Sequence, residues 1–391
     1  MKYIKSYIII LSILITLPYN ENICHAEEIN EWQLYSMSAV LMDGDTGRIL
    51  YEKNGHEKRA MASTTKIMTL ILTLEYGNLD DIVTVSDYAS KMPDVQLGIN
   101  KGEQYKLSDL LYSLMLESHN DSAVAIAEHV GGSKEEFANM MNKKAAELGL
   151  SDTYFITANG LDEEDENGFH STTAADLARL MKYCVLESPK KEEFINICRT
   201  KSHTFSDYEN KRTFTVENAN KFLDMMDGVI AGKTGFTTQA GYCYVAALKR
   251  DNKTYIVALL GCGWPNNKNY KWEDTKKLFN YGIENYNYKT IIDASYPSAK
   301  IKIRDGIEKT QISTYVKDEL TLLISDNDTV QISANIPDCI DAPVNKGDIV
   351  GTVDIYINED LYRTFHVYSS EDVKKVTYYY YLKKVMDCYI Y

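Results

Sequence analysis

Ser63 and Lys66 are a pair of residues that could carry out acyl transfer, because one offers a nucleophile and the other a base. They lie three residues apart at the start of an apolar segment with helical periodicity, so both side chains would share one face of a helix. A serine hydroxyl needs a neighbouring base to take its proton. Lysine can be that base if burial or nearby positive groups lower its pKa. Alone, the two residues would more often be a helix cap and a solvated side chain.

A second polar segment, Ser118-His119-Asn120, follows the apolar run from Leu110 to Leu116 and precedes another helical pattern. A loop between two helices can present a hydroxyl and an amide to one cleft. Ser118 could then relay a proton to a leaving amine, and Asn120 could hold Lys66 and a substrate amide. The ordinary alternative is a helix-to-helix turn that is rich in capping residues.

A third segment, Lys233-Thr234-Gly235, lies just before an apolar strand pattern at 242–248. Lys233 and Thr234 can bind a carboxylate through charge and a hydroxyl group. Gly235 would let a substrate backbone approach closely. The three segments together indicate a serine acyl-transfer site that binds an anionic substrate.

Composition and charge narrow the class of protein. Apolar residues make up 45% of the chain and charged residues 25%, which is typical of a globular protein. The formal net charge of −14 and the lack of a basic stripe exclude nucleic acid as an expected partner. The scattered cysteines form no zinc-binding pattern, so we expect no metal and no cofactor. Buried thiols are the expected state, with a Cys184–Cys198 bridge as an alternative.

The two ends of the chain have distinctive compositions. Lys2 and Lys5 precede an apolar run at 7–17, and small and polar residues lead to Ala26. This layout predicts a signal peptide over 1–26 and export to the cell wall or the outer face of the cytoplasmic membrane. The tail at 372–391 is rich in Tyr and Lys, which suits a membrane surface. As a helix its apolar residues would not gather on one face, so a last strand with a frayed end is an equal alternative.

The periodicity between the ends predicts an α+β protein with two domains. Strand patterns at 38–42 and 48–52 come first, and helical patterns follow from Ser63 and over about 107–117, 121–130, 134–148 and 173–187. Strands return at 242–248 and 254–260, joined by a turn at Asp251-Asn252, before a helix over about 273–286. Short alternating runs beyond 289 predict a smaller all-β domain. We therefore divide the mature chain into 27–288, a β-rich domain at 289–371 and a tail at 372–391.

The segments that contain these motifs resemble the D-alanyl-D-alanine carboxypeptidases, which are low-molecular-mass penicillin-binding proteins. The resemblance is carried by MDGDTGRILYEKN, KRAMASTTKIMT, LSDLLYSLMLESHNDSAVAIAEHVGG, FITANGL, HSTTAADLARL, AGKTGFTTQAGYC and WEDTKKLFNYG. It implies a penicilloyl-serine transferase fold, with an antiparallel sheet and a helical subdomain, followed by a β-rich domain. It also implies that peptidoglycan stem peptides are the substrates and that β-lactam antibiotics acylate the same serine.

The resemblance assigns roles to individual residues. Ser63 would attack the bond between the two terminal D-alanines, with Lys66 as the base and Ser118 and Asn120 completing the proton network. The backbone N–H groups of Ser63 and Phe236 would form the oxyanion hole. Lys233 with Thr234 would bind the terminal carboxylate. The full set of substrate-binding residues would be Lys233, Thr234, Gly235 and Thr237.

Three positions bear on how far the resemblance reaches. His119 occupies a position where the family usually has a small residue. Lys271 replaces an arginine that often helps to bind the carboxylate, so the bidentate fork is lost. His170 is interpreted as a residue that fastens a loop rather than as a catalytic group.

Alternative functions on the same scaffold are a β-lactamase, a DD-endopeptidase or transpeptidase, and a non-catalytic wall-binding protein. A β-lactamase would need a carboxylate that activates water for deacylation. The acidic run at 162–166 lacks the expected pattern for that role and is predicted to be a solvated loop.

Overall fold

The computed structural model describes residues 33–293, 296 and 299–389. The predicted signal peptide at 1–26 lies outside the described residues.

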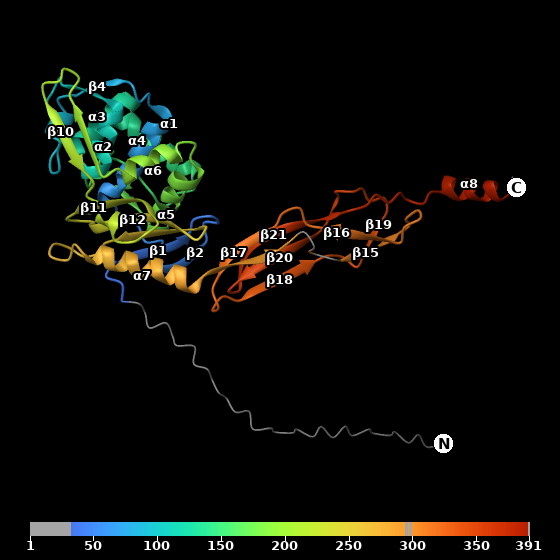
Figure 1. Ribbon diagram of the computed structural model, residues 1–391. Helices are drawn as coiled ribbons and strands as arrows, with labels where there is room; N and C mark the ends of the chain where they lie inside the picture. Colours follow the sequence, from blue (N-terminus) through green and yellow to red (C-terminus); the bar gives the residue numbers. More distant parts are fainter. Residues whose placement is uncertain (1–32, 294–295, 297–298, 390–391) are drawn as a thin grey trace, which may run out of the picture. The chain divides into compact units, whose positions relative to one another are not determined.

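A five-stranded antiparallel sheet is the base of the N-terminal part of the described chain (Figure 1). Its strands follow the order β11-β12-β13-β1-β2, with the bounds β11 (Val229–Thr237), β12 (Gly241–Arg250), β13 (Lys253–Leu260), β1 (Ser38–Asp43) and β2 (Ile49–Lys53). Asp251 and Asn252 have φ angles of 53° and 60°, which a tight hairpin turn between β12 and β13 requires. The predicted strands and turn are confirmed, and β11 extends the sheet with the segment that contains Lys233.

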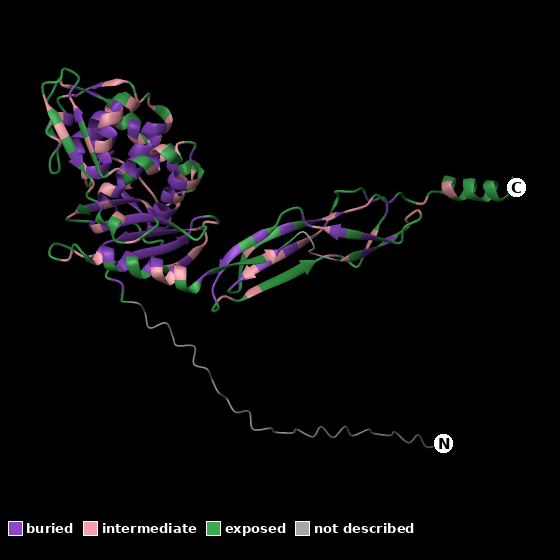
Figure 2. Ribbon diagram, in the orientation of Figure 1, coloured by how far each residue is buried: buried purple, intermediate pink, exposed green. Residues whose placement is uncertain are grey.

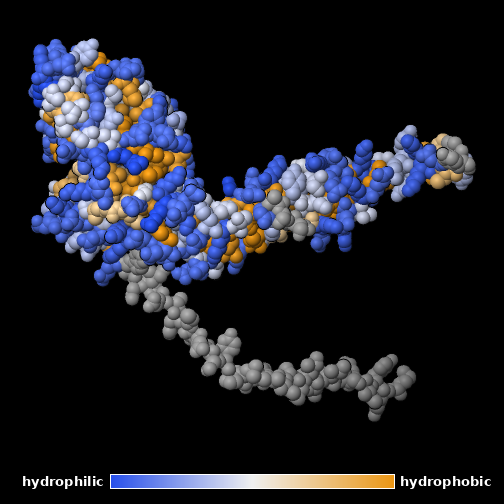
Figure 3. Space-filling view, in the orientation of Figure 1, coloured by the Kyte–Doolittle hydropathy of each residue, from blue (hydrophilic) through white to orange (hydrophobic). Residues whose placement is uncertain are grey.

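Helices cover both faces of this sheet. Val40 and Met42 belong to the core shared with the helical block, whereas Leu41 contacts the region of Gly282 in α7 (Tyr270–Asn285). On the face opposite α7, which is the face of Val40 and Met42, α5 (Ala174–Lys182) packs on β1, β12 and β13. This two-sided cover explains why the central strands read as nearly continuous apolar runs and are buried along most of their length (Figure 2). The visible outer surface is mainly hydrophilic (Figure 3).

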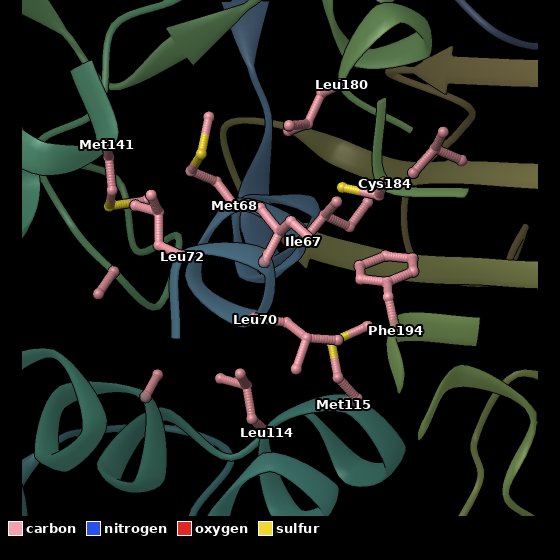
Figure 4. Close-up of a cluster of buried hydrophobic side chains, with 14 of the residues drawn as sticks. Ile67, Met68, Leu70, Leu72, Leu114, Met115, Met141, Leu180, Cys184 and Phe194 are labelled. Atoms are coloured by element: carbon pink, nitrogen blue, oxygen red, sulfur yellow. The ribbon is translucent and has the colours of Figure 1, made fainter. Parts of the chain in front are cut away.

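The helical block surrounds α1 (Lys66–Tyr76), in which every residue from Lys66 to Leu74 is buried. Leu70, Leu114 and Phe194 meet in its hydrophobic core (Figure 4). The surrounding helices are α2 (Leu107–Tyr112), α3 (Asn120–Gly131), α4 (Lys134–Glu147) and α6 (Lys191–Arg199). A helix that is apolar on all sides is a buried helix, and α1 therefore carries Lys66 into the interior.

The predicted helices differ from the structure in their detail. The helix that we expect from Ser63 begins as a 3₁₀-helix, η1 (Ala62–Thr65), and the expected helices at 107–117 and 173–187 end in the π-helices η3 (Ser113–Glu117) and η4 (Tyr183–Glu187). Neither α6 nor the hairpin of β9 (Ser202–Ser206) and β10 (Thr213–Glu217) was predicted from the sequence. The remaining short elements are β3 (Arg59–Ala60), β4 (Ile82–Thr84), η2 (Ala89–Lys91), β5 (Gln104–Lys106), β6 (Glu164–Asp165), β7 (Gly168–Phe169), β8 (Ser171–Thr172) and η5 (Lys221–Asp224).

The C-terminal part is all-β up to residue 369, as expected. A six-stranded sheet in the order β18-β20-β21-β16-β15-β19 and a two-stranded sheet of β14 and β17 enclose an apolar core that includes Ile301, Leu322 and Val353. The strands are β14 (Asn287–Ile292), β15 (Lys300–Arg304), β16 (Gln311–Tyr315), β17 (Leu320–Ile324), β18 (Val330–Asn335), β19 (Cys339–Asp341), β20 (Ile349–Ile357) and β21 (Asp360–Ser369).

Most of the tail forms a helix, α8 (Tyr378–Tyr389), so the alternative of a last strand is wrong for this part. Before it, Val373 and Lys375 form isolated β-bridges with Val344 and Gly306. None of the residues of α8 is buried, and Figure 2 draws this helix as exposed over nearly its whole length. Over the stretches of chain that the structure describes, helices are either too short or too polar to cross a bilayer.

The cysteines of the described chain are free, and Cys184, Cys198, Cys243 and Cys262 are buried. The expectation of buried thiols is confirmed for these four, and the alternative Cys184–Cys198 bridge is not formed.

Candidate active site

Ser63 lies in η1, in a backbone arrangement that the neighbouring loop constrains. Ala62 has a φ angle of 49°, an unusual value for a residue with a side chain and one that often marks functional sites. Gly160 packs so closely on this turn that a Cβ atom there would lie 2.1 Å from the Ala62 carbonyl oxygen. The serine is half-buried and retains exposed surface. Strain and tight packing therefore fix the position of a hydroxyl that a substrate can still reach.

Lys66 is fully buried and binds the Ser63 hydroxyl directly. Its Nζ atom lies 2.9 Å from Ser63 Oγ, 2.8 Å from Asn120 Oδ1 and 2.6 Å from the Asn159 carbonyl oxygen. Burial, and next the positive charge of Lys233, hold the pKa of Lys66 well below its usual value. A neutral amine at this position would accept the serine proton instead of donating to the hydroxyl.

The Ser118–Asn120 turn supplies one polar group to each of two lysines. Ser118 has a left-handed conformation with a φ angle of 70°, and its Oγ atom accepts a bond of 2.9 Å from Lys233 Nζ. Asn120 accepts from Lys66, and its amide donates to the Pro93 carbonyl oxygen at 3.1 Å. The predicted proximity of Ser63, Lys66, Ser118, Asn120 and Lys233 is thus present.

Strand β11 forms the opposite wall through Lys233, Thr234 and Gly235. Lys233 is buried, and burial lowers its pKa to about 7. A Cβ atom on Gly235 would lie 2.9 Å from the Ser63 backbone nitrogen and 3.0 Å from Ala62 Cβ. Glycine is therefore required for β11 to approach η1, and this approach brings the strand backbone beside the N–H groups of the first helical turn.

Phe236 and Thr237 differ from each other in their position relative to the cleft. Phe236 lines the cleft, is 39% exposed and packs on Tyr242 with ring centroids 4.6 Å apart. The Thr237 hydroxyl accepts a bond from the Ala240 backbone N–H at 3.0 Å, and the residue is absent from the cleft lining. Phe236 is thus at the site, whereas the Thr237 side chain stabilises the turn that follows β11.

A cleft of about 390 Å³ extends from Ser63 between β11, the Ser118 turn and the start of α7. Its lining includes a group of cationic residues, namely Lys221, Lys233, Lys268 and Lys271, against a single acidic residue, Glu117. The cleft lining thus has an excess of positive charge although the whole chain has a net charge of −14. Such a cleft attracts an anionic substrate.

Lys271 lies between two aromatic rings in this cleft. Its Nζ atom is 4.6 Å from the ring centroid of Tyr242 and 4.5 Å from that of Trp272, and it donates to the Lys268 carbonyl oxygen. Burial lowers the pKa of Lys271 to about 8. The aromatic faces stabilise a cation here, so a charged amine lines the cleft where the resemblance implies an arginine.

His170 has the structural role that we expected. Its Nδ1 atom accepts from the backbone N–H groups of Ile156 and Thr157 at 2.9 and 3.3 Å, and its Nε2 atom lies 2.7 Å from Thr65 Oγ1. Burial lowers the pKa of His170 to about 3, so the ring is neutral. It fastens the loop before Asn159 to η1, and the loop-fastening interpretation is confirmed.

The acidic run at 162–166 is exposed throughout, as predicted, but Glu164 and Asp165 form the short strand β6 rather than a loop.

Several contributions to the site were not predicted from the sequence. The Asn159 carbonyl group is a backbone acceptor for Lys66, and a backbone role leaves no signature in residue type. Lys221 and Lys268 reach the cleft from a short 3₁₀-helix and from the loop before α7. The one signal in the sequence was the FITANGL segment, which carries part of the resemblance and contains Asn159.

Comparisons with known proteins agree with this geometry. The chain resembles the crystal structure of penicillin-binding protein 5 from Haemophilus influenzae, with a TM-score of 0.70 and 26% identity, over 88% of this chain and 98% of that one. It is 32% identical to the D-alanyl-D-alanine carboxypeptidase DacF of Bacillus subtilis, over 89% of this chain and 88% of that protein. DacC of Escherichia coli, a D-alanyl-D-alanine carboxypeptidase, is 30% identical over 82% of this chain and 79% of its own length.

The fold is therefore that of the penicillin-binding DD-peptidases. Residues 24–263 match the family described as D-alanyl-D-alanine carboxypeptidase, and residues 286–375 match the penicillin-binding protein 5 C-terminal domain. The chain belongs to the D-alanyl-D-alanine carboxypeptidase family, whose members are serine peptidases.

Proposed function

We propose that this carboxypeptidase removes the terminal D-alanine from peptidoglycan stem pentapeptides through an acyl-enzyme on Ser63. The observation that carries the proposal is the 2.9 Å contact between Ser63 Oγ and the buried Lys66 amine. A solvated lysine would be charged at neutral pH and could not act as a base. Burial beside Lys233 favours the neutral amine that base catalysis needs.

In the acylation step, the Lys66 amine takes the proton of the Ser63 hydroxyl, and Oγ bonds to the carbonyl carbon of the penultimate D-alanine. The carbonyl oxygen becomes an oxyanion, which the backbone N–H groups of Ser63 and Phe236 would stabilise. Support for this pair comes from the close packing of Gly235 on the Ser63 backbone nitrogen.

Collapse of the tetrahedral intermediate breaks the bond between the carbonyl carbon and the leaving nitrogen. The proton held by Lys66 passes to that nitrogen through the Ser118 hydroxyl, and D-alanine departs as a free amino acid. Water then hydrolyses the Ser63 ester, with Lys66 accepting the proton of the attacking water. Asn120 would hold the Lys66 amine in place through both steps.

The terminal carboxylate of the substrate would bind beside Lys233 and Thr234, with Lys271 as a third partner. The excess of lysines in the cleft supports this assignment, because charge attraction both recruits and orients a carboxylate. Gly235 leaves room for the peptide backbone along β11. Thr237 would contribute through its backbone, since its hydroxyl bonds to Ala240. β-Lactams, which also carry a carboxylate and a reactive amide, would acylate Ser63 in the same way.

Product analysis with a Ser63→Ala variant tests the proposal. Purified enzyme should release D-alanine from a stem pentapeptide and form a long-lived adduct with labelled penicillin at Ser63. The variant should lose D-alanine release by roughly a thousandfold or more, whereas a Ser151→Ala control on the surface should retain it. Release at the wild-type rate from Ser63→Ala would overturn the mechanism. Faster turnover of a cross-linked dimer would indicate an endopeptidase, and rapid penicillin hydrolysis a β-lactamase.

We further propose that the protein is exported and that α8 touches the outer face of the cytoplasmic membrane. Support comes from the apolar and aromatic side chains that α8 exposes, which include Tyr378, Tyr381, Leu382, Val385 and Met386, together with Lys383 and Lys384. Contrary to the expectation from the sequence, these apolar and aromatic residues recur at spacings of three and four along one face of α8. Amphipathic helices that combine such residues with lysines bind anionic interfaces. The full chain should sediment with anionic vesicles, whereas a variant that ends at residue 376 should stay in the supernatant. N-terminal sequencing of the protein from the cell-wall fraction should give a sequence that begins directly after Ala26.

A further inference from the structure

His119 lies between two residues of the proposed site in the sequence, and its ring contacts two residues of the π-helix η3 in the helical block. The side chain is 5% exposed. Its Nδ1 atom is 2.9 Å from Ser113 Oγ, and its Nε2 atom is 3.2 Å from a carboxylate oxygen of Glu117. These two partners are the first and last residues of the π-helix η3. The ring therefore joins both ends of the segment that leads into Ser118.

The segment that His119 joins has an unfavourable backbone. A π-helical turn is wider than an α-helical one and is rare outside functional sites. Ser118, at its end, has a φ angle of 70°, which costs about 1–2 kcal/mol for a residue with a side chain. The conformation persists only if the surroundings fix it, and the two ring contacts of His119 are placed to do so.

The contacts continue from His119 into the neighbouring elements. Ser113 Oγ is 2.7 Å from Ser122 Oγ in α3, and Glu117 accepts from the Glu217 backbone N–H in β10 at 2.8 Å. Because a carboxylate can only accept, Glu117 favours a proton on Nε2, and Nδ1 then accepts from the Ser113 hydroxyl. A neutral histidine thus satisfies every partner in this chain of contacts.

The charged groups around the ring are consistent with that neutral form. Glu117 and Asp121 attract a proton to His119, whereas Lys66 and Lys233 oppose it. Burial outweighs these effects and lowers the pKa of His119. The ring is thus a fixed donor and acceptor rather than a third cation beside the two lysines.

We infer that His119 is a positioning residue for the proposed acyl transfer, which holds the Ser118 hydroxyl against Lys233 and the Asn120 amide against Lys66 through Ser113 and Glu117. This inference rests on the proposed function. It assigns a task to a residue that departs from the small one usual in the family. A small side chain at this position could make neither contact, so the alignment of the two site residues would depend on the backbone alone.

The test compares His119→Ala with two conservative variants. His119→Asn can restore the contact with Ser113, and His119→Gln the contact with Glu117. We expect His119→Ala to lower the rate of penicillin acylation and kcat for D-alanine release by about tenfold to a hundredfold, with KM changed less than about twofold. Each conservative variant should recover part of the loss. His129→Ala, in helix α3, which begins directly after His119, and also beside a carboxylate, is the matched control and should retain the wild-type rate.

A double-mutant cycle with Ser113→Ala decides whether the histidine acts through the serine. If it does, the double variant should be no slower than the slower single variant. Wild-type rates in folded His119→Ala, independent multiplying effects of the two changes, or a loss that no conservative variant reduces would each overturn the inference. A wild-type enzyme without D-alanine release would instead contradict the proposed function.

Discussion

The Lys66 amine lies 2.9 Å from the Ser63 hydroxyl, and it is completely shielded from solvent. The two residues are separated by less than one helical turn, but the burial comes from the position of α1, in which every residue from Lys66 to Leu74 is buried. A second lysine, Lys233, further lowers the pKa of the first. The surroundings of Lys66 therefore lower its pKa and allow its amine to act as a base.

Acylation should have an acid limb that moves when Lys233 is replaced. Lys66 must be neutral to accept the Ser63 proton, so the acylation rate should rise with pH through the pKa of Lys66. Lys233→Met removes a positive charge that lowers this pKa, so the limb should shift to higher pH. The measurement is the rate constant for acylation by a labelled penicillin as a function of pH. An acid limb at the same pH in Lys233→Met and in the wild type would show that the charge of Lys233 does not affect the pKa of Lys66.

Gly235→Ala should reduce acylation while the protein remains folded. The new Cβ atom would lie 2.9 Å from the Ser63 backbone nitrogen, so β11 or η1 must move apart. A displacement of this kind at a reacting centre costs about a hundredfold in rate. Stopped-flow acylation and circular dichroism measure the two effects. Gly102→Ala is the control, because nothing lies within 4 Å of its Cβ position, so that any strain from its positive φ angle stays in its own turn; an equal loss in both variants would contradict the steric argument.

The sequence was sufficient to predict the central strands, because both of their faces are buried and they therefore contain continuous apolar runs around residues such as Val245 and Ile256. It also predicted the proximity of Ser63, Lys66 and Lys233, through motifs that a known family shares. It did not predict α6, where Phe194, Ile197 and Cys198 are the buried residues of a nine-residue helix. Three apolar residues within a polar segment are too few for periodicity to be decisive.

Other features escaped prediction because they depend on tertiary contacts. The positive φ angle of Ala62 is imposed by the Gly160 loop, which is distant in sequence. The Asn159 carbonyl group acts through the backbone. The tail was ambiguous because an exposed helix needs no apolar face toward a core, and α8 has no buried residue.

Lys233→Met should also make the protein more stable at neutral and acid pH. Burial lowers the pKa of Lys233 to about 7, whereas an unfolded lysine titrates near 10.4. Between these values the unfolded chain binds more protons, so wild-type stability rises with pH from about 7 to about 10. Below pH 7 the fold must contain a buried cation, and its removal should stabilise the protein by about 1–4 kcal/mol.

Urea unfolding at several pH values measures this stability difference. The gain from Lys233→Met should be largest below pH 7 and should decrease as the pH approaches 10. A control at an exposed position, Lys201→Met, should show no such pH dependence, since Lys201 is largely solvated. A destabilised Lys233→Met at pH 6 would mean that the bonds to Ser118 and to the Thr234 carbonyl oxygen outweigh the cost of burial.

Lys271 should make the KM for the peptide substrate depend on alkaline pH. Burial lowers the pKa of Lys271 to about 8, so the amine is charged below that pH and neutral above it. Loss of the charge weakens attraction for the terminal carboxylate. KM should therefore rise above about pH 8, whereas kcat should change less, because the amine of Lys271 contacts Tyr242, Trp272 and the Lys268 carbonyl oxygen rather than the reacting groups.

Lys271→Arg separates charge from geometry at this position. Arginine remains charged at every accessible pH and offers two parallel donors to a carboxylate, so the alkaline rise in KM should disappear and KM at pH 7 should fall by about two- to tenfold. Its planar group can also stack between Tyr242 and Trp272, where the amine now lies. Lys271→Met should raise KM at all pH values while it keeps the rings packed. Steady-state D-alanine release from pH 6 to 10 measures these effects, and an alkaline rise that persists in Lys271→Arg would assign it to another group, with Lys233 as the first candidate.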